Sequence, residues 1–362
     1  AVLATVLFLI IKTHGADLAA PADPSEPYSA ARPEWYFMFL FQFLKYQNDL
    51  FGWLPGNPEI WAAMVIPGLL MGIVFTMPIL GRWQLGHRFN IGMLWASLGG
   101  VALLTYLAYA QDRGDANYIV AAREAAQASE RITVLAQAPS GIPPTGAVTL
   151  LRNDPLTQGP KLFSKNCASC HRFGGHDGLG NQPKDPASAS DLKGFASHEW
   201  LAGLLDPQRI GTTNYFGATK HKDGKMAGFV NKKVGKYSVE QRENLKKGIA
   251  ALSAEAQLKS QRAIDTRDAS VINEGRALLT GDLSCTECHQ FRKKDEDATA
   301  PDLTGYGSRE WLTKIISNPT HESLYGKRND RMPKFGDDEI LDAHAIGLLA
   351  DWLRGDWYEP AR

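Results

Sequence analysis

Hydrophobic positions are distributed unevenly along the 362-residue chain. The first 110 residues are strongly apolar and aromatic, whereas the remainder is polar and rich in Gly and Lys. Residues 60–80 and 91–110 each contain no charged side chain. Each segment is about as long as the 20 residues that a helix needs to cross the hydrocarbon core of a bilayer. The pattern predicts a helical membrane part over residues 1–110 that contains these two spans.

A shorter apolar run, AVLATVLFLII at residues 1–11, opens the sequence. It is too short to span a bilayer by itself. It could be the core of a signal peptide, but no basic segment precedes it and no small-residue cleavage site clearly follows. We therefore interpret the run as the later part of a membrane helix.

The loop between the two spans indicates their orientation. Residues 81–88 contain Arg82 and Arg88 and no acidic side chain. The positive-inside rule places such a loop in the cytoplasm. The sequence therefore predicts a multi-pass protein of the bacterial cytoplasmic (inner) membrane, with everything after Ala110 on the periplasmic side.

The polar part of the chain contains an internal repeat. Residues 111–150 form a predicted linker, which begins with an Ala-, Glu- and Arg-rich surface helix and includes the Pro- and Gly-rich stretch 139–146. After it, Asp-Leu-Lys-Gly-Phe at 191–195 recurs as Asp-Leu-Thr-Gly-Tyr at 302–306, and Glu-Trp-Leu at 199–201 recurs at 310–312. Apolar positions at helical spacing predict closing helices at 239–252 and 340–354. We expect two similar domains, residues 151–258 and 259–362, in an all-α chain.

Charge excludes one class of function. The 39 Lys and Arg side chains balance 39 Asp and Glu side chains, so the formal net charge is zero. A chain without a basic excess gives no support for nucleic-acid binding. We therefore expect no nucleic-acid partner.

All four cysteines lie in two Cys-x-x-Cys-His motifs, at 167–171 and 285–289. This motif is typical of covalent c-type haem attachment, in which the adjacent His becomes an iron ligand. A zinc half-site would need four converging ligands, and a redox dithiol does not need the following His. The pattern predicts two haem c groups, which are held by the following residues: Cys167, Cys170, His171, Cys285, Cys288 and His289.

Each repeat resembles a class I cytochrome c, with a helix before the haem motif and another at the end. The resemblance implies a methionine as the sixth iron ligand, which raises the reduction potential. Met332 lies in Arg-Met-Pro-Lys-Phe, and Met226 holds the equivalent place for the first haem, although Ala-Gly follows it instead of proline. His221 and His198 lie in the same region and remain alternatives to Met226. We interpret His176, His321 and His344 as surface or helix histidines without a role at iron.

A second motif, Pro33-Glu34-Trp35-Tyr36, precedes the predicted spans. By itself it could be an interfacial acid beside an aromatic belt. Its flank, Phe-Met-Phe-Leu-Phe-Gln-Phe-Leu-Lys at 37–45, makes residues 1–110 resemble the C-terminal part of cytochrome b, and most closely subunit IV of cytochrome bf-type complexes. The resemblance implies half of an outer-side quinol-oxidation site. In it, Glu34 accepts a quinol hydroxyl hydrogen bond and relays the proton, and Tyr36 helps to orient the Rieske partner.

The same resemblance implies components that this chain lacks. Its membrane segments contain no histidine pair for b haems, and every cysteine is used by the haem motifs, so none remains for a Rieske 2Fe–2S cluster. We expect these cofactors on two partners, a subunit that resembles the N-terminal half of cytochrome b and a Rieske subunit. A soluble acceptor such as a cytochrome c, membrane lipid and a dimeric complex complete the expected partners.

We therefore expect a subunit of a quinol:cytochrome c oxidoreductase that is not active alone. Its dihaem part would relay electrons from the Rieske cluster to the soluble acceptor, with protons released outside. The alternative is a membrane-anchored dihaem cytochrome c without quinone chemistry. A dihaem peroxidase would need an open haem position, and a candidate Met in both repeats argues against it.

Overall fold

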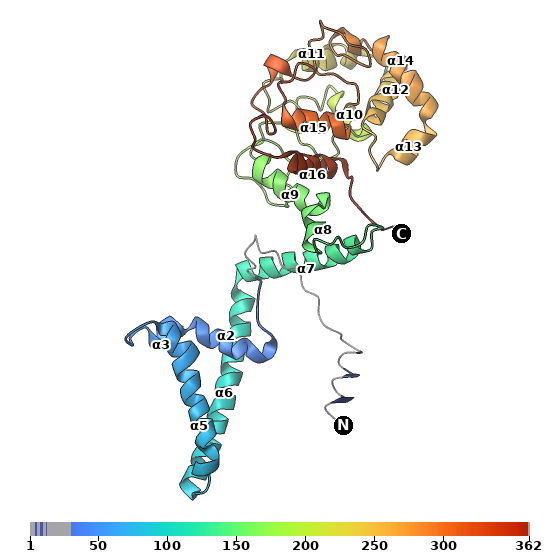
Figure 1. Cartoon of the computed structure of the whole chain (residues 1–362). Helices are drawn as coiled ribbons and strands as arrows, with labels where there is room; N and C mark the ends of the chain where they lie inside the picture. Colours follow the sequence, from blue (N-terminus) through green and yellow to red (C-terminus); the bar gives the residue numbers. More distant parts are fainter. Residues whose placement is uncertain (1–3, 6–7, 10–11, 13–29, 361–362) are drawn as a thin grey trace. The chain divides into compact units, whose positions relative to one another are not determined.

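The computed structural model describes residues 4–5, 8–9, 12 and 30–360. Most of the apolar run at 1–11 therefore lies outside the described residues. The chain divides into two compact units, residues 1–131 and 132–362. Regular structure in the described part is helical, and three isolated β-bridges are the extended pairings there. This confirms the prediction of a mostly helical chain (Figure 1).

The first unit contains two long apolar helices. A short 3-10 turn, η1 (Trp35–Phe37), leads into α2 (Met38–Lys45) and α3 (Gln47–Phe51). The first long helix is continuous over Pro58–Leu80 and comprises α4 (Pro58–Ile60), the π-helical turn η2 (Trp61–Val65) and α5 (Ile66–Leu80). The second is α6 (Gln84–Gly114), and α2 packs along it.

Both long helices have the length and composition of membrane spans. An 18-residue stretch of each has a mean hydropathy of 2.2 and 1.7, respectively, and almost none of these stretches is buried within the chain. Phe75, for example, is 85% exposed. Large apolar side chains that face outward along a helix are typical of contact with lipid, because water would make their exposure unfavourable. The positions agree with the spans predicted at 60–80 and 91–110.

The linker and the first repeat begin with helices that follow local capping signals. Helix α7 (Ala116–Ala136) occupies much of the predicted linker, and α8 (Val148–Arg152) follows it. The first repeat contains α9 (Pro155–Asn166), α10 (His198–Leu204), α11 (Lys225–Lys232), η3 (Val234–Lys236) and α12 (Val239–Glu255). Ser238 and Gln241 form a reciprocal capping box that begins α12 at Val239, as the sequence predicts.

The second repeat uses the same local structure. It contains α13 (Arg262–Arg267), α14 (Ala269–Thr280), η4 (Cys285–Glu287), α15 (Arg309–Ser317), η5 (Gly326–Arg328) and α16 (Ala343–Arg354). Ser308 caps α15 through the N–H of Trp311, as Ser197 caps α10 through Trp200. Helix α16 begins three residues later than the predicted 340 because Asp342 accepts the Ala345 N–H and fixes the N-cap there.

The first and last helices of the two repeats pack crosswise. Helix α9 of the first repeat lies against α16 of the second, and α12 of the first lies against α14 of the second (Figure 1). The middle helices stay with their own repeat, because α10 packs on α12 and α15 packs on α16. One hydrophobic core runs through both repeats. Helices of the two repeats therefore pack across the boundary predicted at 258/259, and residues 132–362 form one compact unit, so the division into two domains stays a prediction.

Two glycines make these close helix crossings. A Cβ at Gly159 in α9 would lie 2.2 Å from the Cβ and Cγ of Trp352 in α16. A Cβ at Gly275 in α14 would lie 2.0 Å from the backbone oxygen of Lys247 in α12. Glycine occupies the same register in both repeats because each first helix must approach its partner this closely.

Candidate haem c sites and the membrane-side cavity

The two Cys-x-x-Cys-His motifs adopt the same compact turn. Cys167 is the C-cap of α9, and its N–H donates to Phe163 O at 2.8 Å. The His171 N–H then donates to Cys167 O at 2.8 Å, and the His289 N–H donates to Cys285 O at 3.0 Å. One helical turn therefore brings each histidine back beside the first cysteine of its motif.

Each motif histidine is oriented by a backbone carbonyl. His171 Nδ1 lies 2.7 Å from Ser190 O, and His289 Nδ1 lies 2.7 Å from Pro301 O. A ring that donates from Nδ1 keeps the Nε2 lone pair for a metal. Burial lowers the pKa of both imidazoles, so they stay neutral, which is the ligating form. The sequence did not reveal these carbonyls, which come from loops further along the chain.

The four motif cysteines are partly buried and are not joined by disulfide bonds. Burial raises the pKa of Cys167 to about 12 and that of Cys285 to about 11. A thiol that burial holds neutral is a weak nucleophile.

The two candidate methionines belong to the shared core. Met226 on α11 and Met332 are partly buried and pack against the hydrophobic cluster. Asn329 Nδ2 donates to Met332 O at 2.9 Å and holds that loop. Two thiols, an imidazole and a partly buried thioether are donor types that suit haem c, so the residues present fit this group.

The alternative histidine ligands have other neighbours. His198 Nε2 lies 3.6 Å from Asp265 Oδ1. The His221 ring stacks on Tyr325, with 5.7 Å between the ring centroids. Of the histidines predicted to have no role, His176 Nδ1 contacts Gly174 O and His344 is exposed.

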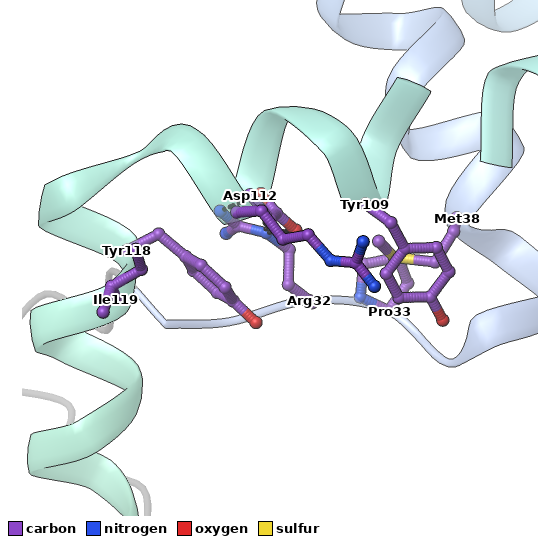
Figure 2. A pocket seen from close by; sticks show the side chains of 8 residues that line it. Arg32, Pro33, Met38, Tyr109, Asp112, Tyr118 and Ile119 are labelled. Atoms are coloured by element: carbon purple, nitrogen blue, oxygen red, sulfur yellow. Dashed lines mark hydrogen bonds and ion pairs between the residues drawn. The ribbon is translucent and has the colours of Figure 1, made fainter. Parts of the chain in front are cut away.

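In the first unit, Pro33 lines a cavity of about 390 Å³ (Figure 2). Arg32 crosses this cavity and makes a forked ion pair with Asp112 on α6, with Nη2–Oδ1 at 2.8 Å and Nε–Oδ2 at 2.9 Å. Its guanidinium carbon also lies 4.0 Å from the Tyr118 ring centroid. Sequence reasoning missed this pair because the two residues are 80 positions apart.

The other motif residues face outward. Glu34 is exposed and precedes η1, and its carboxylate does not cap that turn. Trp35 and Tyr36 are exposed and meet edge to face, with 5.6 Å between ring centroids. The structure of this chain therefore places Pro33 at the cavity and Glu34 on an open surface.

Comparison with known proteins finds relatives of the part of the chain that contains the haem motifs. Residues 156–253 match the cytochrome c family. The chain is 27% identical over 172 residues to the menaquinol:cytochrome c reductase cytochrome c subunit of Bacillus subtilis (strain 168), covering 45% of this chain and 55% of that protein. It is 31% identical over 99 residues to the subunit of the same name from Geobacillus thermodenitrificans, covering 26% and 37%.

The matched part of the chain thus spans about half or less of the length of these relatives. No solved structure matches. The match over 156–253 includes the first haem motif, and a cytochrome c domain binds its haem covalently. The chain therefore contains a cytochrome c domain and is homologous to cytochrome c subunits of menaquinol:cytochrome c reductases.

Proposed function

We propose that the chain is a subunit of a quinol:cytochrome c oxidoreductase of the cytochrome bc type. The observation that carries the proposal is its homology to cytochrome c subunits named for menaquinol:cytochrome c reductases. Two helices long and apolar enough to span a membrane support the placement in a membrane complex. In this proposal the haem motifs face the outer side of the cytoplasmic membrane.

The residues around Glu34 are suited to quinol oxidation. A quinol gives up two protons as it is oxidised, so a base must meet its hydroxyl group in an apolar site. Glu34 lies between Pro33 at the cavity and the exposed Trp35 and Tyr36. A partner that covered this face would enclose the carboxylate among aromatic rings, and the Arg32–Asp112 pair holds the preceding backbone on α6. We propose that Glu34 accepts the quinol proton there and that Tyr36 orients the Rieske partner.

The repeats would carry the outward transfer. Haem c supplies reversible one-electron oxidation and reduction when it is bound. Cys167, Cys170, Cys285 and Cys288 attach two such groups, and His171 and His289 hold the imidazole nitrogen toward iron. Met226 and Met332 complete the ligand sets, and their thioethers favour the reduced state.

The proposal requires partners. A subunit with b haems, resembling the N-terminal half of cytochrome b, takes the second quinol electron, and a Rieske subunit delivers the first to this chain. A soluble acceptor such as a cytochrome c receives it, and the complex is dimeric. Protons are released on the outer side.

Purification of the intact complex tests the proposal. We expect a b-type haem spectrum, a Rieske electron paramagnetic resonance signal and inhibitor-sensitive quinol oxidation. Glu34→Gln should slow turnover by about 100-fold or more, because a positioned base contributes that much, and leave the c-haem spectrum intact. Glu59→Gln, which changes another exposed carboxylate of the same unit, is the matched control.

Two outcomes would contradict the proposal. A complex without b haem and Rieske signal would favour a membrane-anchored dihaem carrier without quinone chemistry. Turnover that is equal in Glu34→Gln and in the wild-type chain would remove Glu34 from the reaction.

A further inference from the structure

Each repeat can be divided into two parts, and the terminal helices of these parts pack with the other repeat. We call residues 155–195 and 269–306 the attachment halves, because each contains a first helix, a Cys-x-x-Cys-His motif and the carbonyl that orients its histidine. We call residues 196–255 and 307–354 the methionine halves, because each contains a middle helix, the candidate methionine and a closing helix. Within a methionine half the middle and closing helices pack together, whereas the first helices pack on the closing helices of the other repeat.

The second attachment half is held by the first methionine half. Glu255, at the end of α12, is 6% exposed. Its Oε1 pairs with Arg276 at 3.3 Å and with Arg292 at 2.5 Å, and its Oε2 accepts the Gly305 N–H at 3.2 Å. All three partners belong to the second attachment half. A carboxylate this buried requires such partners, so the contact is specific and not merely apolar.

The second haem motif lies close to the segment that follows Met226. Lys233 and Tyr237 connect α11 to α12 in the first repeat, and both are near enough to Cys285 to interact with it electrostatically. Leu283, two residues before Cys285, occupies the space beside Gly248 of α12, where a Cβ would lie 2.4 Å from its Cδ1. Part of the surroundings of Cys285 thus comes from the first repeat.

The first attachment half is covered by the second methionine half in the same way. The Trp352 ring of α16 lies 5.4 Å from the Phe163 ring and 4.3 Å from the Phe173 ring, measured between centroids. These phenylalanines flank the first haem motif, four residues before Cys167 and two after His171. Trp352 is 5% exposed, so this aromatic cluster is part of the buried core.

The two repeats touch each other at equivalent residues. A Cβ at Gly307 would lie 2.3 Å from the Cβ of Ala196, which occupies the same position in the first repeat. Just before them, the rings of Phe195 and Tyr306 lie 5.3 Å apart. The two repeats therefore meet here, although the Trp200 Nε1–H still donates to Asp191 O and the Ser190 hydroxyl donates to Tyr215 O within the first repeat.

We infer that the two haem sites are composite, so that each haem is attached by one repeat and receives its sixth ligand from the other. The haem on Cys167 and Cys170, with His171, takes Met332. The haem on Cys285 and Cys288, with His289, takes Met226. This arrangement reverses the pairing by order in the sequence, and it rests on the proposed haem attachment.

Single-haem forms of the full chain separate the two pairings. C167S/C170S leaves the second haem and C285S/C288S leaves the first. In each background, M226A and M332A are compared by the methionine sulfur-to-iron charge-transfer band of the oxidised protein. We expect complete loss of the band with M226A in the C167S/C170S background and with M332A in the C285S/C288S background, and retention in the other two combinations.

Retention of the band in the first two combinations would overturn the crossed pairing. Its loss with M332A in the C167S/C170S background and with M226A in the C285S/C288S background would also overturn it. If an alanine variant fails to fold, M226H and M332H keep a sixth ligand. A bis-histidine spectrum and a lowered potential should then appear only in the crossed combinations, and their appearance in the uncrossed ones would overturn it. Absence of covalent haem from the unsubstituted chain would instead contradict the proposed attachment, so the two failures are distinguishable.

Discussion

Substitution of Gly159 by Ala tests the crossing of α9 over α16. Alanine is the better helix former by about 1 kcal/mol, so an isolated helix would gain stability. In the folded chain the new Cβ would lie 2.2 Å from two atoms of Trp352 and 2.8 Å from a third. Overpacking of this kind costs about 1–3 kcal/mol. We therefore expect Gly159→Ala to destabilise the soluble part despite its helix propensity.

Trp352→Ala should reduce the destabilisation that Gly159→Ala causes. The truncation alone should cost about 3–5 kcal/mol, because it removes a buried indole from Phe163 and Phe173. In that background the contacts with Cγ and Cδ2 are gone, but the Cβ of residue 352 still lies 2.2 Å from the new Cβ, so Gly159→Ala should cost less than in the wild-type chain without becoming stabilising. The double-mutant cycle should give a coupling of about 0.5–3 kcal/mol between residues of different repeats.

Denaturant unfolding of the haem-loaded chain in detergent, followed by Soret absorbance, measures these changes. Gly275→Ala is the matched control, because its Cβ would meet the Lys247 backbone and not Trp352. Its cost should be equal with and without Trp352→Ala. A Gly159→Ala variant that is stabilised in the wild-type background, or whose effect is unchanged by Trp352→Ala, would refute the reasoning.

Three further perturbations test other contacts. Glu255→Gln should lower the free energy of unfolding by about 3 kcal/mol, because it removes the buried carboxylate that pairs with Arg292. The control Glu243→Gln, in an exposed ion pair on the same helix, should change the free energy of unfolding by less than about 0.5 kcal/mol. Burial alone would raise the pKa of Asp177, but the hydrogen bonds that its carboxylate accepts outweigh burial and lower the pKa. The ionised carboxylate therefore stabilises the folded chain above the pKa of the unfolded state, and this stabilisation is lost on acidification. The stability difference between wild type and Asp177→Asn should accordingly shrink below about pH 4 in urea titrations, and a pH-independent difference would contradict this. Arg32→Ala should accelerate hydrogen exchange across residues 33–37, whereas Arg82→Ala should not, and equal protection in both variants would remove the Asp112 pair as the anchor.

The local structure was predictable because its signals are local. Ser238 and Gln241 form a box within one turn, and each Cys-x-x-Cys-His motif contains its own attachment residues. The orienting carbonyls of Ser190 and Pro301 were not predictable, because a backbone oxygen leaves no residue signature. The Arg32–Asp112 pair was not predictable either, because the local sequence around each residue does not indicate a partner 80 positions away.

The crosswise helix packing could not be predicted for a different reason. The two repeats have the same pattern, with Gly159 and Gly275 at one register and similar apolar faces on α12 and α16. Either first helix therefore fits either closing helix by pattern alone. Contacts outside that pattern, such as those of Glu255 and Trp352, distinguish the partners.

The pairing of α9 with α16 has a consequence for synthesis of the protein. Helix α9 leaves the ribosome near the start of the repeats and α16 near their end, so the first repeat cannot complete its interior while it is the only one made. Contacts between such distant segments form late and leave apolar surface open meanwhile. A stop codon between the repeats would thus not yield a smaller working protein but one with an unpartnered α9. Once the helices of the two repeats packed crosswise, loss of one repeat would also have left the other without a complete interior. The duplication is therefore hard to reverse in evolution.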